Sequence, residues 1–168
     1  MPVKRIAIIA DTHVPSRESA LPEWVVDELA RADHTIHAGD FDSRQTYDRI
    51  AALANRDLTA VRGNTDPPTI DAPRAATLEI GDVTFAVTHG AGSPTGWRQR
   101  VIEAARAETS ASDPVAVAGH THEVVETTVD GIRLLNPGSA TGAAPADRAT
   151  MYVATVEDGE LTVELRTE

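Results

Sequence analysis

Cysteine is absent from the 168 residues of this chain, and Lys4 is its only lysine. Without cysteine the protein has neither a disulfide bond nor a thiolate metal site, so any metal must bind through oxygen or imidazole nitrogen. No apolar run approaches the roughly 20 residues that span a bilayer, which argues against a membrane protein. The first residues run directly into a strand-like segment and lack the layout of a secretion signal, so we expect a cytoplasmic protein.

Positive charge is scarce as well, with 15 basic against 26 acidic residues and a formal net charge of −11. Such a surface repels the phosphate backbone, which disfavours binding to duplex nucleic acid. The acidity has two interpretations: some carboxylates bind cations at a site, or the surface is heavily hydrated, as would suit a salt-rich cytoplasm. The length fits a single domain, and without a long linker or an internal repeat we expect it to extend over residues 1–168.

Apolar runs, turn signals and helical spacing predict alternating strands and helices in the first two thirds of the chain, and strands alone thereafter. Helices are predicted to start at Pro22, after a Ser43 cap, and at Pro94. The predicted strands are residues 3–10, 35–38, 58–62, 77–80, 83–88, 115–118, 124–129, 132–135, 150–156 and 161–165. This order predicts an α/β domain of two packed sheets, the second formed by the strand-rich part.

The stretch Gly119-His120-Thr121-His122 follows one of the apolar runs. In extended backbone, residues i and i+2 point the same way, so both imidazoles can converge on one spot. Polar side chains also follow the other strands of the parallel type, and strand ends of this type meet at one sheet edge, where ligands bind. The candidate metal ligands are Asp11, His13, Asp40, Asn64, His89, His120 and His122. These exceed what one tetrahedral zinc needs and suit a pair of cations that share a carboxylate.

Other polar and aromatic residues have simpler structural interpretations. His34 and His37 lie at or inside a strand, before the ligand position, and we expect them to be structural. Trp97 has apolar neighbours at helical spacing and is expected in the core. Arg17 and Arg44 could reach a phosphate from loops, although surface positions are the simpler interpretation.

Five short blocks of sequence carry a family resemblance: Asp11-x-His13, Gly39-Asp40, Gly63-Asn64-x-Asp66, His89-Gly90 and Gly119-His120-x-His122. In this order and spacing they resemble the calcineurin-like metallophosphoesterases. With the late Asn136-Pro137-Gly138-Ser139, they look most like the small, single-domain prokaryotic phosphodiesterase branch. We expect Ser139 to belong to a turn that lines the site.

The resemblance implies a four-layer α/β/β/α sandwich of two mixed sheets and a dinuclear centre. Asp11, His13 and His122 would hold the first metal. Asn64, His89 and His120 would hold the second, with Asp40 as the bridge. Mixed carboxylate, amide and imidazole ligands suit several divalent cations. We expect Mn²⁺ first, with Fe, Zn, Co, Ni or Mg as alternatives.

The implied reaction is hydrolysis of a small phosphoester, as a phosphodiesterase, by a metal-bridged hydroxide. Asp40, Asn64 and His120 are the expected catalytic residues, and Thr65 and Asp66 are further candidates. Thr65 stands where the family commonly has the histidine that is often assigned as acid to the leaving group. A hydroxyl hydrogen-bonds a phosphate oxygen but is a poor proton donor, so weak activity on alkoxide leaving groups is expected. The first block is usually followed by a glycine, and here Val14-Pro15 follows it. This difference affects how closely the loop can approach the substrate, and not metal binding.

A second interpretation belongs to another class of function. A retromer subunit of eukaryotes resembles this family in fold and acts chiefly as a scaffold that binds other proteins. Competent side chains at all seven ligand positions favour catalysis, whereas Thr65 leaves room for the scaffold. The strand-rich part could also offer an edge for a homodimer or a higher oligomer.

Overall fold

The computed structural model describes residues 2–168. Within that range the chain forms three helices and ten strands, in the predicted order. The helices are α1 (Glu23–Arg31), α2 (Arg44–Leu53) and α3 (Trp97–Glu108). The strands are β1 (Lys4–Ile9), β2 (His34–His37), β3 (Leu58–Ala60), β4 (Ala75–Ile80), β5 (Val83–Thr88), β6 (Val115–Val117), β7 (Val124–Val129), β8 (Ile132–Pro137), β9 (Thr150–Glu157) and β10 (Glu160–Thr167).

Two of the three helices begin where the sequence predicted, and the third begins later. α1 begins directly after Pro22, and the Ser43 side chain caps α2 by accepting the Thr46 N–H at 3.1 Å. α3 begins at Trp97 and not at Pro94. Gly96 lies between them with φ of 79°, a left-handed conformation that cannot belong to a right-handed helix.

The strands form two mixed sheets of five strands, with the orders β10-β9-β1-β2-β3 and β4-β5-β6-β8-β7. The prediction that the later strands make up the second sheet is wrong for the last hairpin. β9 and β10 return to the first sheet, where β9 pairs antiparallel with β1. This pairing supplies β1 with a neighbour on each side, β2 being the other. Local periodicity carries no signal for a pairing between the two ends of a chain.

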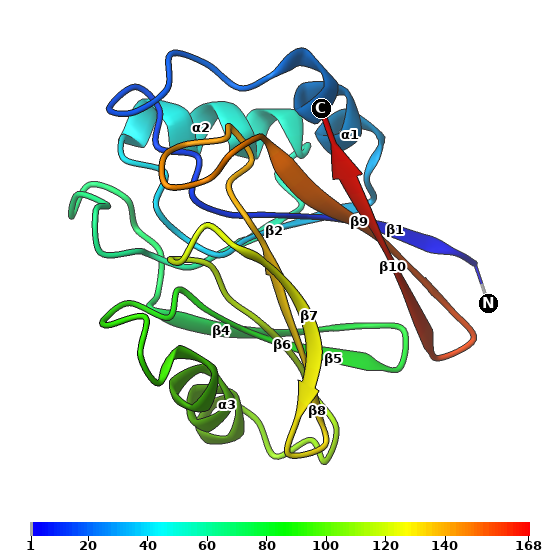
Figure 1. The fold of residues 1–168 in the computed structure, drawn as a ribbon. Helices are drawn as coiled ribbons and strands as arrows, with labels where there is room; N and C mark the ends of the chain where they lie inside the picture. Colours follow the sequence, from blue (N-terminus) through cyan, green and yellow to red (C-terminus); the bar gives the residue numbers. More distant parts are fainter. Residues whose placement is uncertain (1) are drawn as a thin grey trace.

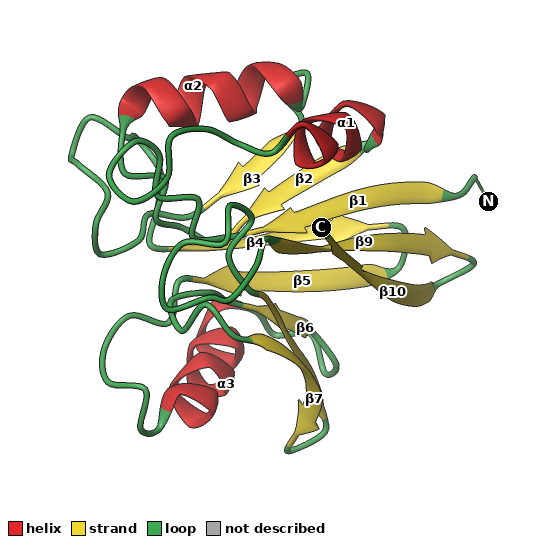
Figure 2. Ribbon diagram, turned by 45° about the horizontal axis from the view of Figure 1, so that its top comes forward, coloured by secondary structure: helices red, strands yellow, loops and turns green. Residues whose placement is uncertain are grey.

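Apolar side chains between the sheets form one core, in which Ile8, Phe85 and Tyr152 are fully or almost fully buried. α1 and α2 cover the outer face of the first sheet, and α3 covers the outer face of the second. Figures 1 and 2 show the resulting order of layers, with α1 and α2 at the top and α3 at the bottom. The fold is therefore the expected four-layer α/β/β/α sandwich. In residues 2–168, no helix has the length and apolar character needed to cross a membrane.

The loops that follow β1, β2, β3, β5 and β6 gather on one side of the molecule, at the left of Figure 2. The first three strands belong to one sheet, and β5 and β6 belong to the other. The ligand-bearing loops therefore come from two facing sheets and not, as the sequence suggested, from the edge of one. This arrangement encloses the site from two sides.

Candidate metal centre

Backbone conformation is unusual at the ends of three strands. Asp11, His13, Asp40, Asp42, His120 and His122 all have positive φ, between 47° and 81°. A non-glycine residue in this left-handed region costs on the order of 1–3 kcal/mol, and such residues cluster at functional sites. Asp and His belong to the residue types that tolerate this region best. Six such residues at one end of the fold therefore mark a candidate site before any ligand chemistry is considered.

Asp11, His13 and His122 form one group whose ligand atoms lie within 4.8 Å of one another. The Nε2 atoms of His13 and His122 are 3.2 Å apart, and both face Asp11 Oδ1, at 3.9 Å and 3.6 Å. All three side chains are buried. This is the set that the resemblance assigned to the first metal.

Asp40, His89 and His120 form a second group within the same limit. Asp40 Oδ2 lies 3.0 Å from His89 Nε2 and 3.5 Å from His13 Nε2, so this carboxylate oxygen reaches both groups. That position agrees with the bridging role that the resemblance implied for Asp40. Loops after β1, β2, β5 and β6 thus supply two adjacent ligand groups.

His120 and His122 do not converge on one spot, as extended backbone would have required. His122 belongs to the first group and His120 to the second. The physical reason is that both residues lie beyond the end of β6 with φ of 75° and 62°, so the geometry of a strand does not apply to them.

Hydrogen bonds fix which nitrogen of each imidazole faces the site. His89 Nδ1–H donates to the Ala38 carbonyl at 2.7 Å, and His122 Nδ1–H donates to the Ala143 carbonyl at 2.9 Å. His120 Nε2–H donates to the Gly92 carbonyl at 2.8 Å. A carbonyl only accepts, so each ring leaves its other nitrogen for the site.

Asp42 performs the same task for His13. Its two carboxylate oxygens lie 2.9 Å and 3.0 Å from His13 Nδ1. It also accepts hydrogen bonds from the hydroxyls of Ser16 and Thr65. Sequence reasoning missed this role of Asp42. The spacing Asp40-x-Asp42, which repeats that of Asp11-x-His13, was the available signal.

The arrangement fits a pair of cations. With Nδ1 of both rings directed at acceptors, the Nε2 lone pairs of His13 and His122 face each other at 3.2 Å. Two ligand atoms at about 2.1 Å from a shared cation are separated by about 3.0–3.4 Å, which is close to that spacing. Asp11 Oδ1 is buried without a hydrogen-bond partner, and the buried His89 Nε2 faces the Asp40 carboxylate at 3.0 Å. A cation between these groups would satisfy the buried Asp11 oxygen.

Burial and neighbouring charge shift the titration of these groups. Burial raises the pKa of Asp11 to about 8. Burial disfavours a charged His89 ring, but Asp40 and Asp11 beside it outweigh burial and raise the pKa of His89 to about 9. Burial would raise the pKa of Asp40, yet His89 and the Thr65 N–H hold it below its usual value. Burial lowers the pKa of His122. Without metal, Asp11 and His89 therefore hold protons near neutral pH that a cation must displace.

The loop after β3 places the remaining candidates at the rim. Asn64 and Thr65 are exposed, and the Thr65 N–H donates to Asp40 Oδ1 at 3.0 Å. Asp66 is not a ligand in either group. It accepts the N–H groups of Asp40, Asp42 and Gly63 at 2.8–3.0 Å and so ties this loop to the loop after β2. A side chain at Gly63 would collide with Asp40, whose Oδ1 would lie 2.1 Å from the added Cβ.

Buried hydrogen bonds hold the loop after β6 and the late turn against the site. Trp97 Nε1–H and Asn136 Nδ2–H both donate to the Gly119 carbonyl, at 3.0 Å and 3.2 Å. Ser139 donates to the Asp11 carbonyl at 2.7 Å, which agrees with the expected turn. Trp97 is in the core, as predicted, and also braces the residue before His120.

The two histidines expected to be structural lie outside the ligand groups, as do the two arginines considered as phosphate contacts. The fully buried His37 contacts the Thr12 hydroxyl at 3.3 Å and accepts the Gly39 N–H at 3.0 Å, and burial lowers its pKa to about 3. His34 contacts Thr59, which agrees with a structural role. Arg17 donates to the Ala144 carbonyl, whereas Arg44 pairs with an aspartate in its own helix.

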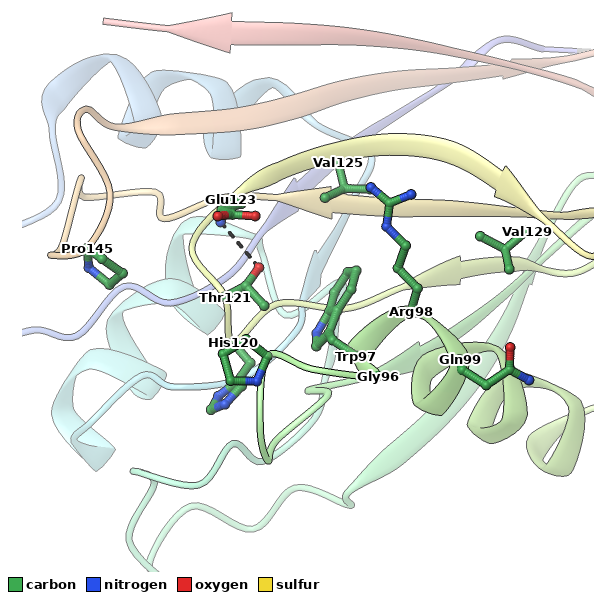
Figure 3. A pocket seen from close by; sticks show the side chains of 11 residues that line it. Gly96, Trp97, Arg98, Gln99, His120, Thr121, Glu123, Val125, Val129 and Pro145 are labelled. Carbon is green, nitrogen blue, oxygen red and sulfur yellow. Dashed lines mark hydrogen bonds between the residues drawn. The ribbon is translucent and has the colours of Figure 1, made fainter.

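A cavity of about 650 Å³ opens beside His120. Figure 3 shows that His120 and Thr121 border it on one side, with Trp97, Arg98 and Gln99 from α3 nearby. Glu123 and Val125 line it from the start of β7. A small molecule in this cavity would therefore lie next to the second ligand group.

This fold and these paired ligand groups define the metallophosphoesterase class. Residues 5–159 match the calcineurin-like phosphoesterase superfamily domain, and the chain belongs to that family. A probable metallophosphoesterase of Methanocaldococcus jannaschii is 36% identical over 81% of this chain and 68% of its own length. A phosphodiesterase of the same organism is 31% identical over 82% of this chain and 85% of its own length.

Solved structures agree with the fold. Wild-type Vps29 of Entamoeba histolytica, in complex with zinc, is 27% identical and has a TM-score of 0.70. The match covers 97% of this chain and 98% of that chain. The likeness includes the whole sandwich and both ligand-bearing sheets.

Proposed function

We propose that this protein is a metal-dependent phosphodiesterase that hydrolyses a small phosphoester at a centre of two cations. The observation that carries the proposal is the pair of facing Nε2 atoms of His13 and His122, with the unpartnered Asp11 Oδ1 close by. These groups offer a cation two imidazole nitrogens and a carboxylate oxygen, in a chain that belongs to the calcineurin-like phosphoesterase superfamily. The diesterase preference is supported by the related phosphodiesterase and by the open cavity next to His120.

The chain's own residues would hold and orient the reacting groups. The first group would hold one cation, and His89, His120 and the exposed Asn64 carboxamide would hold the second, with Asp40 shared. When bound, the cations would stabilise the negative charge on the phosphoryl oxygens and lower the pKa of a water molecule. The oxygen and nitrogen donors fit Mn²⁺, our first proposal, and also Fe, Zn, Co, Ni or Mg.

The loop after β3 carries Thr65 where the family commonly has a histidine, and its Asp66 carboxylate accepts three backbone N–H groups. Thr65 donates its hydroxyl to Asp42 at 2.5 Å and is a poor proton donor at neutral pH. We therefore propose that a diester with a phenolate leaving group, which departs without a proton, is hydrolysed much faster than an alkyl diester.

The test is hydrolysis of bis(p-nitrophenyl) phosphate with metal content measured in the same samples. Activity should require added divalent cation and disappear on chelation. Asp40→Ala and His120→Ala should abolish it, because each removes a ligand. Asp48→Ala and His34→Ala, which change the same residue types away from the site, should leave it intact. Unchanged turnover in both ligand variants would refute the assignment.

The alternative is a protein-binding scaffold that keeps the fold and the metal. Thr65, in place of the family's common histidine, is the observation that favours it. Stoichiometric metal without turnover of any phosphodiester or phosphomonoester would support the scaffold over the enzyme.

A further inference from the structure

A second cavity, of about 270 Å³, lies on the β5 side of the metal centre. Arg62, Arg74 and Arg100 all line it, together with Thr88 and His89. No acidic residue is among the residues that line it. The chain as a whole has a net charge of −11, so a cavity bordered by three arginines and no carboxylate is locally positive in an acidic protein.

Two of these arginines lack the partners that others on the surface have. Arg5, Arg44 and Arg133, for example, pair with carboxylates at 2.7–2.8 Å. Within residues 2–168, the side chains of Arg62 and Arg74 form neither an ion pair nor a hydrogen bond. Their guanidinium groups are therefore free to bind a ligand.

The third arginine is partly engaged, and a buried hydroxyl beside it is not. Arg100 donates to the Gly90 and Ser93 carbonyls at 3.1 Å and 2.8 Å, so it also braces the loop after β5. Thr88 is only 8% exposed, and its Oγ1 is buried without a hydrogen-bond partner. The Nε atoms of Arg62 and Arg100 are likewise buried without a partner. The Thr88 hydroxyl is thus a buried polar group beside the cavity whose hydrogen bond the chain itself does not supply.

The chemistry of the cavity selects the ligand. Planar guanidinium groups bind phosphate through charge-assisted hydrogen bonds, often in pairs. A phosphate group offers several acceptor oxygens and negative charge, which matches donors from three arginines and a threonine hydroxyl. A neutral or cationic ligand would leave the same charges uncompensated.

The position of the cavity connects this ligand to the metal centre. His89 belongs to the second ligand group and also lines the cavity. Arg62 is two residues before Asn64 on the loop after β3, and its N–H donates to the Pro73 carbonyl, next to Arg74. The cavity therefore borders both the loop that carries His89 and the loop that carries Asn64.

We propose that the cavity bordered by Arg62, Arg74 and Arg100 binds a second, non-reacting phosphate of the substrate, so that the preferred substrate is a phosphodiester that carries a further phosphate group. This proposal rests on the proposed function. It assigns the substrate class through residues that the metal centre does not use.

The experiment compares Arg62→Gln/Arg74→Gln with the wild-type protein and with Arg31→Gln/Arg56→Gln. The control pair removes the same charge from exposed positions, Arg31 at the end of α1 and Arg56 in the turn after α2. Arg100 is left unchanged because it braces a loop. Two substrates share one scissile ester: thymidine 5′-(p-nitrophenyl phosphate) and its 3′-phosphorylated derivative. In parallel, binding of inorganic phosphate to the chelated proteins is measured by calorimetry.

The wild-type protein should prefer the 3′-phosphorylated substrate. Loss of Arg62 and Arg74 should lower kcat/KM for that substrate by about tenfold to a hundredfold, as expected for lost charge-assisted hydrogen bonds. The other substrate should change by less than about threefold, and the control variant should match wild type on both. Phosphate binding to the chelated protein should be lost only in Arg62→Gln/Arg74→Gln.

An equal change on both substrates, no preference in the wild-type protein, or no phosphate binding would overturn the proposal. Absence of hydrolysis of both substrates by the metal-loaded wild-type protein would instead contradict the phosphodiesterase function. In that case, phosphate binding to the chelated protein still decides whether the arginine cavity is an anion site.

Discussion

Asp42→Asn tests how far the metal centre depends on a residue that binds no metal itself. Asp42 places its oxygens 2.9 Å and 3.0 Å from His13 Nδ1, and its side chain is only 8% exposed. The carboxylate thereby fixes the His13 tautomer with Nε2 toward Asp11 and His122. Asparagine has nearly the same shape but carries no charge, so it weakens this bond and leaves the packing in place.

The expected effect is a selective loss of affinity at one of two metal sites. A hydrogen bond to a charged group contributes about 1.5–3 kcal/mol. Loss of such a partner behind a metal-bound histidine lowers metal affinity by about 10–100-fold, which corresponds to about 1.4–2.7 kcal/mol. The first group, which contains His13, should lose this affinity, and the second group should keep its own.

The assay is a calorimetric titration of the chelated protein with Mn²⁺, repeated for Asp42→Asn and for Asp48→Asn. Asp48 is an exposed carboxylate that pairs with Arg44 on α2, so its variant controls for the change in net charge. Unaltered affinity at both sites, or an equal loss at both, would refute the reasoning from His13 orientation.

Two further predictions concern stability, measured by urea unfolding in chelator. Asp66→Asn should lower the free energy of unfolding by about 1.5–3 kcal/mol, because one charged side chain accepts three backbone N–H groups and an amide cannot replace it; an effect no larger than that of Asp48→Asn would contradict this. The second prediction concerns His37, whose pKa is about 3 in the folded protein and about 6.5 in the unfolded chain. Between these values the unfolded chain binds the extra proton, so stability from neutral His37 is full above pH 6.5 and falls as the pH drops toward 3. At pH 5 the wild-type protein should have lost about 2 kcal/mol relative to pH 7 that His37→Gln does not lose, and parallel curves for the two proteins would contradict it. The raised pKa of Asp11 acts in the opposite direction, but it is shared by both proteins and cancels in the comparison.

Local sequence was sufficient to predict the elements and most of the site. Strands and helices follow from apolar periodicity and caps such as Ser43, and these signals act over a few residues. Six residues of the predicted ligand set lie together in the two candidate groups because each follows a strand. The ends of these strands meet on one side of the molecule although the strands belong to two sheets. The partition itself depends on pairing between β1 and β9, which no local pattern records.

Residues that act through another residue were harder to predict. Asp42 belongs to neither ligand group, and its role depends on the distance to His13, which the fold alone determines. Asp66 was a further catalytic candidate, and in the structure its carboxylate joins two loops by accepting backbone N–H groups. The cavity bordered by Arg62, Arg74 and Arg100 could not be predicted, because these arginines come from three separate segments that share no motif.

The prediction from strand geometry placed His120 and His122 near the site but assumed the wrong backbone conformation for them. Left-handed backbone is tolerated best by Gly, Asn, Asp and His, and Asp and His are also metal ligands. At Asp11-Thr12-His13 and at His120-Thr121-His122 the two ligands have positive φ, whereas the β-branched threonine between them does not. A residue that suits the turn therefore also suits the metal. One choice of residue type then satisfies both requirements. A threonine flanked on each side by Asp or His therefore predicts a ligand-bearing turn more specifically than strand alternation does.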